Sequence, residues 1–146
     1  MAVLIVLFGS WLVFRSAGAV GVGALASWHD SARYALAVMF VFTGIAHFNK
    51  MKHDLARMVP QVVPHPMLVI YLTGVLEILG AVGLLLPDLC SLAGICLAVL
   101  LIVMFPANVK ADREKLLLAG RRATVLWLRL PMQLVFIGLL LWSART

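Results

Sequence analysis

A few polar side chains interrupt otherwise apolar stretches of this sequence, and they are its candidates for chemistry. Glu77 stands in the middle of the apolar run 67–86, with Thr73 four residues before it on the same helical face. An ionisable group in hydrocarbon is costly unless it is paired, so Glu77 needs a structural partner or a functional role. A carboxyl group near a histidine can exchange a proton with a bound polar headgroup or a quinone oxygen.

His47 ends another apolar run and shares its helical face with Thr43 and Gly44. Two roles are possible for His47: it is either a hydrogen-bonded residue of the helix packing or a partner of Glu77 across a helix bundle. Gly74 and Ala81 lie on the face of Glu77, and small residues there allow neighbouring backbones to approach closely. The face of Glu77 is therefore expected to point into the bundle.

Three further polar residues occur just after the fourth apolar run or within the fifth, where Gln133 reaches about the depth of Glu77. Asn108 follows Pro106 and would either cap the carbonyl freed by the proline or face a ligand. Arg129 and Gln133 are four residues apart, hence on one face, and Arg129 could also extend to the membrane surface. The predicted ligand-binding set is His47, Thr73, Glu77, Asn108, Arg129 and Gln133, with His47 and Glu77 as the candidates for catalysis.

Arg15 lies in the first apolar stretch, 2–25, at a depth from which it would not easily reach the surface. It is expected to pair with a carboxylate, and Glu77 is the acidic residue well inside a predicted span. Cys90 and Cys96 are six residues apart and point to different faces of a helix, which is neither a redox pair nor a zinc spacing. No metal site is predicted.

The composition identifies the elements that must position these residues. Of 146 residues, 64% are hydrophobic and 12% are charged, whereas a soluble domain is about half apolar and a quarter charged. These values exclude an ordinary soluble domain and a disordered chain. They predict an all-α integral membrane protein, because a spanning helix uses about 20 apolar residues.

Five spans are predicted within a single transmembrane domain that covers residues 1–146. The first is peripheral, and it is too long and irregular for a signal peptide. An internal proline, Pro131, is tolerated in the last. The predicted spans are 2–25, 32–48, 67–86, 91–105 and 124–142.

The net charge of +6 predicts orientation in a membrane and not a nucleic-acid partner. Loops 49–66 and 109–123 hold eight of the twelve basic residues, and five spans put both loops on one side. By the positive-inside rule that side is cytoplasmic, so the N-terminus is expected inside and the C-terminus outside. The expected location is a bacterial cytoplasmic (inner) membrane, with membrane lipids as partners.

Several short runs, taken in order, resemble the DoxX-like family of small membrane proteins. The runs are 44–48, 58–60, 64–66, 73–85 and 105–108. The resemblance implies a four-helix bundle to which the first helix is an addition. It also implies a link to redox systems, since family members resemble membrane parts of such systems, including a thiosulfate:quinone oxidoreductase subunit. The matching polar residues are His47, Glu77 and Asn108.

Three functions follow as hypotheses, and whether the protein is an enzyme stays open. The first is a redox-associated protein that binds a quinone or similar lipophilic molecule around His47 and Glu77, with a soluble redox subunit on its cytoplasmic loops. The second is a noncatalytic accessory or chaperone for another membrane protein, which would use a glycine-rich face at Gly18, Gly21 and Gly23. The third is a small transporter, which would need to form a homo-oligomer because no inverted repeat is present.

Overall fold

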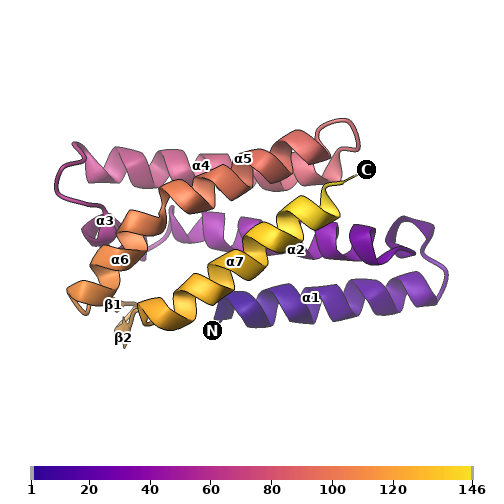
Figure 1. The fold of residues 1–146 in the computed structure, drawn as a ribbon, viewed down its shortest axis with the longest axis horizontal. Coiled ribbons are helices and arrows are strands. Elements are labelled where there is room, and N and C mark those ends of the chain that lie inside the picture. Colours follow the sequence, from indigo (N-terminus) through magenta and orange to yellow (C-terminus); the bar gives the residue numbers. More distant parts are fainter. Residues whose placement is uncertain (1, 146) are drawn as a thin grey trace.

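Within residues 2–145, which the computed structural model describes, five long helices run back and forth along one axis (Figure 1). Short elements connect them at the two ends. The long helices are α1 (Ala2–Ala19), α2 (Trp28–Ala46), α4 (Pro66–Leu85), α5 (Cys90–Val103) and α7 (Leu126–Ser143). The short elements are the 3-10 turn η1 (Gly23–Leu25), α3 (Lys52–Met58), α6 (Phe105–Arg113) and a hairpin of β1 (Leu117–Leu118) and β2 (Arg121–Arg122), which pair antiparallel.

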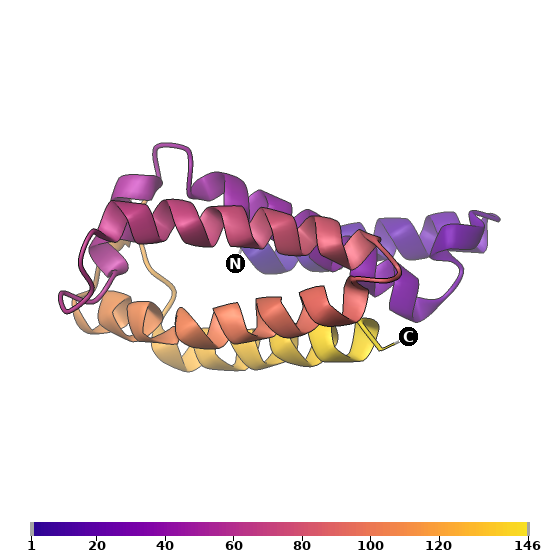
Figure 2. The same ribbon diagram turned by 90° about the horizontal axis from the view of Figure 1, so that it is seen from above.

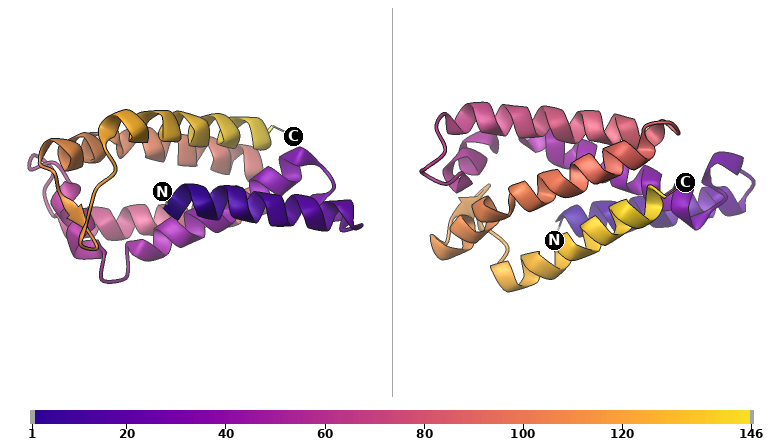
Figure 3. Two further views of the ribbon diagram at one scale, coloured as in Figure 1. Left: turned by 90° about the horizontal axis from the view of Figure 1, so that it is seen from below. Right: turned by 45° about the horizontal axis from the view of Figure 1, so that its top comes forward.

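Helix α2 is the centre of the bundle. It packs against α1, α4 and α7, while α5 bridges α4 and α7. Seen from above, α1, α2 and α4 form one layer and α5 and α7 form the other (Figure 2). Helix α1 is displaced along the bundle axis toward the end that holds the C-terminus (Figure 3). This displacement agrees with the prediction that the first helix is peripheral, since Leu7 is its one buried residue among those described.

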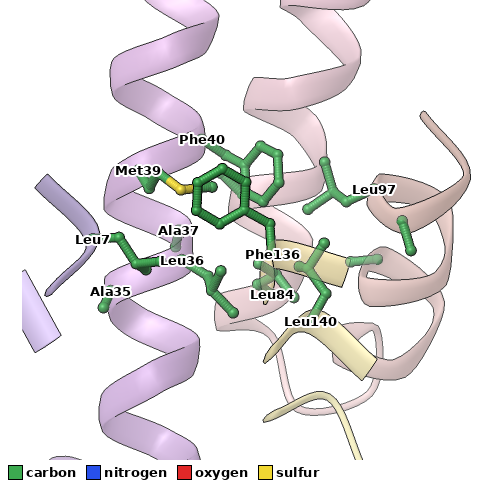
Figure 4. Packing of buried hydrophobic residues seen from close by; sticks show 13 residues of the cluster. Leu7, Ala35, Leu36, Ala37, Met39, Phe40, Leu84, Leu97, Phe136 and Leu140 are labelled. Carbon is green, nitrogen blue, oxygen red and sulfur yellow. The ribbon is translucent and has the colours of Figure 1, made fainter. Parts of the chain in front are cut away.

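The core lies where the five long helices meet, and it is closely packed (Figure 4). Phe40 of α2 and Phe136 of α7 contribute the two large rings, and Leu84 and Leu97 fill the space from α4 and α5. Long apolar side chains also face outward on every long helix. The exposed set includes Leu12, Val41, Leu79, Ile102 and Leu134. Such a surface is suited to lipid, which explains why the core can remain small.

Four helical segments among the described residues are long and apolar enough to cross a membrane: α1, α4, α5 together with α6, and α7. The chain is therefore mostly helical and has the helices of a membrane protein, as the composition predicted. Helix α2 is not one of the four, because His29, Asp30 and Arg33 lower the hydropathy of its first turns. The predicted boundaries lie within a few residues of the observed ones for every long helix except the first.

The prediction of one continuous first span over 2–25 is wrong. Helix α1 ends at Ala19, and Gly21 adopts φ +108°, a left-handed conformation that reverses the chain. A Cβ at Gly18 would lie 2.0 Å from the carbonyl oxygen of Leu25, so this glycine lets the turn close. The glycine-rich face that was expected to bind a partner does not exist, because Gly18 is covered and Gly21 and Gly23 belong to the turn.

The two basic segments lie at the same end of the bundle, as predicted. Lys110 Nζ donates to the carbonyl of Val59 at 2.8 Å, and the amide of Ala119 donates to Asp54 at 3.0 Å. Leu55 and Met58 of α3 pack with residues of α6 and the hairpin in a second small core. The apolar face of α3 is therefore packed against protein at the basic end of the bundle.

The predicted loop 109–123 is also partly helical. The fourth span was expected to end near Pro106, but the helix only breaks at Met104 and resumes as α6, with Pro106 in the first turn. Proline is well tolerated there, because the first turn of a helix has no use for its missing N–H. After the break α6 contacts α3 and α7, and Asn108 lies at the first turn of α7.

Candidate functional site

Glu77 is joined to α2 by one short hydrogen bond. Thr43 Oγ1 donates to Glu77 Oε2 at 2.7 Å, and the Glu77 residue is only 3% exposed. No ion pair involves Glu77 within residues 2–145, where the salt bridge present joins Arg33 to Asp30. A neutral hydroxyl is thus the partner of the carboxyl group in the middle of α4.

His47 lies one turn beyond Thr43, at the C-terminal cap of α2, and is 4% exposed. Its Nδ1 is 3.0 Å from the carbonyl oxygen of Thr43. A carbonyl only accepts, so this contact assigns the proton of a neutral imidazole to Nδ1 and leaves Nε2 as an acceptor. Nε2 is buried and has no hydrogen-bond partner among the described residues. We refer to Thr43, His47 and Glu77 as the Glu77 cluster.

Two glycines bring α2 and α4 close enough to form the Glu77 cluster. A Cβ at Gly74 would lie 2.6 Å from the Cβ of His47 and 2.9 Å from the ring of Phe48. A Cβ at Gly44 would lie 2.8 Å from Ile78 and 3.5 Å from the Cβ of Glu77. The small-residue face predicted around Glu77 does point into the bundle, and it is what permits a threonine to reach the carboxylate.

A second polar contact joins α6 to α7. Arg129 donates from its guanidinium to Asn108 Oδ1 at 2.5 Å. Arg129 occupies the first turn of α7, at the basic end of the bundle. The side chain of Asn108 therefore accepts a hydrogen bond from an arginine on a neighbouring helix.

Gln133 and Thr73 bond to backbone groups. Gln133 Nε2 donates to the carbonyl of Leu101 at 2.7 Å. Leu101 lies in the last turn of α5, where backbone carbonyls have no donor within their own helix. Gln133 Oε1 is buried without a partner in the described part of the chain. Thr73 donates to carbonyls of its own helix, at Val69 and Ile70.

The six predicted ligand-binding residues thus form separate groups. His47 and Glu77 share Thr43, Asn108 and Arg129 bond to each other, and no hydrogen bond or ion pair within residues 2–145 links the two groups. The expected ion pair between Arg15 and Glu77 is not formed. It packs over the ring of Trp28, with 4.9 Å between the guanidinium carbon and the ring centroid. The expectation failed because α1 is shorter than predicted, so Arg15 lies near its end.

An open hollow lies beside the Glu77 cluster at the basic end. Phe48, Asn49, Lys50, Lys52 and His53 line about 400 Å³ of space. Phe48 is shared, since it lines the hollow and also lies against Gly74. Its ring stacks on Tyr71, whose hydroxyl accepts from Lys52 at 2.9 Å. The hollow therefore has aromatic and cationic walls.

Sequence reasoning missed Thr43 as a member of the site, although it placed this residue on the face of His47. The signal was the spacing of four between Thr43 and His47, which puts a hydroxyl one turn from the imidazole. It also missed the role of Arg15 with Trp28, because the two residues approach only after the chain turns at Gly21. Cys90 is buried, Cys96 is exposed, and both are free thiols.

Comparison with known proteins corrects the expected family. No curated protein and no solved structure matches the chain. The resemblance to the DoxX-like family is wrong, since the family model that matches is a different one. The runs that suggested DoxX are short and consist mostly of glycines, prolines and apolar residues, which recur in many membrane helices. The matching model covers residues 36–145, from the middle of α2 to the end of α7, and the chain belongs to the family described as Domain of unknown function (DUF8561).

Proposed function

We propose that this protein is an integral membrane protein that binds a lipophilic small molecule by its polar head at the Glu77 cluster. The observation that carries the proposal is the buried, unpartnered Nε2 of His47. His47 lies one turn from Thr43, whose hydroxyl donates the single hydrogen bond that Glu77 receives from the described residues. Buried polar atoms in proteins are nearly always hydrogen-bonded, so these two groups lack partners that a ligand or a water could supply.

The chemistry of the cluster defines the head that it would accept. With the proton on Nδ1, His47 Nε2 needs a donor, and a carboxylate likewise accepts. A hydroxyl-bearing head satisfies either group. A quinol or a phenol has such a head on an apolar body, whereas a hydrocarbon without a donor gains nothing at this position. No redox role is proposed, because the chain belongs to a family other than the DoxX-like one that implied it.

The approach to the cluster would run through the hollow lined by Phe48, Asn49, Lys50, Lys52 and His53. Its aromatic wall suits a ring or chain, and its lysines suit polar groups at the membrane surface. Phe48 stands between the hollow and the backbone at Gly74, so a movement of this ring would connect the hollow to His47. No residue outside this end of the bundle is needed.

Placement in the membrane is also proposed. Helix α2 would be the fifth crossing, with its polar first turns at the membrane surface and its sides shielded by α1, α4 and α7. The basic end would lie in the cytoplasm, the N-terminus inside and the C-terminus outside, in a bacterial cytoplasmic membrane. The hollow would then open toward the cytoplasmic leaflet.

A second candidate function is packing against another membrane protein or a second copy of the chain. Helix α1 favours it, because Leu7 is its one buried residue among those described and the apolar side chains of Ile5, Leu12 and Val13 are exposed.

The test is ligand binding by the purified chain in a mild detergent. Ubiquinol with a short isoprenoid tail is the probe, and the oxidised quinone, which lacks the hydroxyl donors, is its comparison. Glu77→Gln is expected to weaken ubiquinol binding about tenfold, since a hydrogen bond to a charged group contributes roughly 1.5–3 kcal/mol. Glu114→Gln, an exposed position at the same end, is the control and should bind as the unaltered chain does. Equal affinity of the Glu77→Gln protein would refute the assignment.

A further inference from the structure

A second hollow lies at the opposite end of the bundle, between α1 and the start of α2. It is open at the surface, has a volume of about 210 Å³, and is lined by Phe8, Trp11, Leu12, Arg15 and Trp28. Three of these residues form an aromatic wall. Phe8 stacks on Trp11 with ring centroids 6.2 Å apart, and Trp11 meets Trp28 edge to face at 6.2 Å. Nothing in the proposed function uses this hollow.

Arg15 supplies the charge of this hollow, and that charge is not neutralised by the described residues. Its guanidinium lies over Trp28, and its Nε is buried without a hydrogen-bond partner in the part of the chain that the structure describes. The nearby carboxylate of Asp30 is engaged elsewhere, since it accepts from Arg33 at 3.0 Å and from Ser27 at 2.6 Å. A cation in this setting attracts an anion from outside the protein.

A second donor borders the same hollow. The indole Nε1 of Trp11 is buried, and residues 2–145 offer it no acceptor. An indole nitrogen can only donate a hydrogen bond, and the same holds for a guanidinium. Trp11 Nε1 and Arg15 Nε therefore both lack an acceptor. An oxyanion supplies acceptors to the guanidinium and the indole together, which a neutral or cationic molecule does not do as well.

The position of this hollow in the fold indicates which kind of oxyanion it would bind. Arg15 precedes the last residue of α1 by four positions, which is about 6 Å along a helix, and Trp28 opens α2. This is the depth at which tryptophan and arginine meet lipid headgroups. The apolar side chains of Phe8 and Leu12 continue along α1 toward the membrane interior, beside the path that an acyl chain would take.

We propose that the hollow between α1 and α2 binds the phosphate of an anionic lipid, with Arg15 and Trp11 Nε1 as donors and Phe8, Leu12 and Trp28 against its glycerol and acyl carbons. The site is separate from the Glu77 cluster. It assigns to α1 a function in lipid binding, and it explains how an arginine can be placed in an apolar helix without a carboxylate partner.

The experiment is native mass spectrometry of the detergent-solubilised chain with phosphatidylglycerol or phosphatidylcholine of identical acyl chains. Tighter retention of phosphatidylglycerol by the unaltered protein is expected. Arg15→Gln should reduce that preference about fivefold, because a basic residue near an anionic surface contributes about 1 kcal/mol. Trp11→Phe should weaken it as well, by removing the indole donor while keeping the aromatic wall.

Two controls keep the result decisive. Arg145→Gln removes a positive charge from the same end of the bundle but outside the hollow, and it should retain the preference. Arg15→Lys keeps the charge if the glutamine variant does not fold, and should keep most of the preference. Equal retention of the two lipids by the unaltered chain, or an equal loss in the Arg145→Gln variant, would overturn the proposal. Displacement of phosphatidylglycerol by millimolar inorganic phosphate would replace the lipid with a free anion as the occupant and also reject it.

Discussion

The hydroxyl of Thr43 and the carboxyl group of Glu77 are 2.7 Å apart, and this hydrogen bond is the polar link between α2 and α4. It lies among apolar side chains, one turn from a histidine whose outer nitrogen has no partner in residues 2–145. The bond joins the two helices, and it orients the carboxyl group that is proposed to meet a ligand.

The structural role of Thr43 and Glu77 can be measured by a double-mutant cycle. Thr43→Val and Glu77→Leu are each expected to destabilise the protein, and the pair should lose less than the sum. Side-chain hydrogen bonds between membrane helices couple by about 0.6 kcal/mol on average, with a maximum near 1.7 kcal/mol. Reversible unfolding in mixed detergent micelles gives the free energies of the four proteins. Strict additivity would show that the bond contributes nothing to stability.

Adding a side chain at Gly74 should force α2 and α4 apart. Gly74→Ala would place a methyl group 2.6 Å from the Cβ of His47, which cannot rotate away. A loss of stability of about 1–3 kcal/mol is expected, as for other overpacked contacts. Ligand binding should fall with it, because the helices must separate to accept the methyl group.

Gly138→Ala is the matched control for this prediction. A Cβ at Gly138 in α7 meets nothing within 4 Å, so alanine there should be neutral or stabilise the helix by up to about 1 kcal/mol. Thermal unfolding of both variants in the same detergent decides between them. Similar melting temperatures for the two alanine variants would contradict the close contact at Gly74.

The contact between Arg129 and Asn108 should hold α7 to the basic end. Asn108→Leu removes the acceptor and leaves the guanidinium without its partner, which is expected to cost about 1.5–3 kcal/mol, the value for a hydrogen bond to a charged group. Asn108→Asp keeps an acceptor and should retain most of the stability. The measurement is again unfolding in detergent, and equal stability of the leucine and aspartate variants would argue against the bond.

The proposed orientation is tested by cysteine labelling in whole cells and inverted vesicles. In a background with Cys90 and Cys96 replaced by alanine, a cysteine at Lys115 should react with a membrane-impermeant maleimide only in inverted vesicles. A cysteine at Asp88, in the turn between α4 and α5, should react only in whole cells. Labelling of both from one side would be incompatible with the proposed topology.

The sequence by itself determined the membrane class, the long helices and the face of Glu77. These follow from local quantities, since a run of apolar residues long enough to span a bilayer is visible in composition, and small residues at helical spacing mark the contact face. The sequence also predicted that both basic segments lie at one end of the bundle. Two spans separate the segments, and two successive antiparallel spans return the chain to the end from which it started.

The partners of the polar residues depended on the tertiary structure. Arg15 was expected beside Glu77, but the turn at Gly21 shortens α1 and places the guanidinium on Trp28. Thr43 was seen as a neighbour of His47, but its distance to Glu77 depends on how closely Gly44 and Gly74 let α2 and α4 approach. Hydrogen bonds are made over about 3 Å, whereas helical periodicity only specifies a direction around each axis. Which polar groups meet, and which remain without a partner, was therefore decided by the packing of the helices.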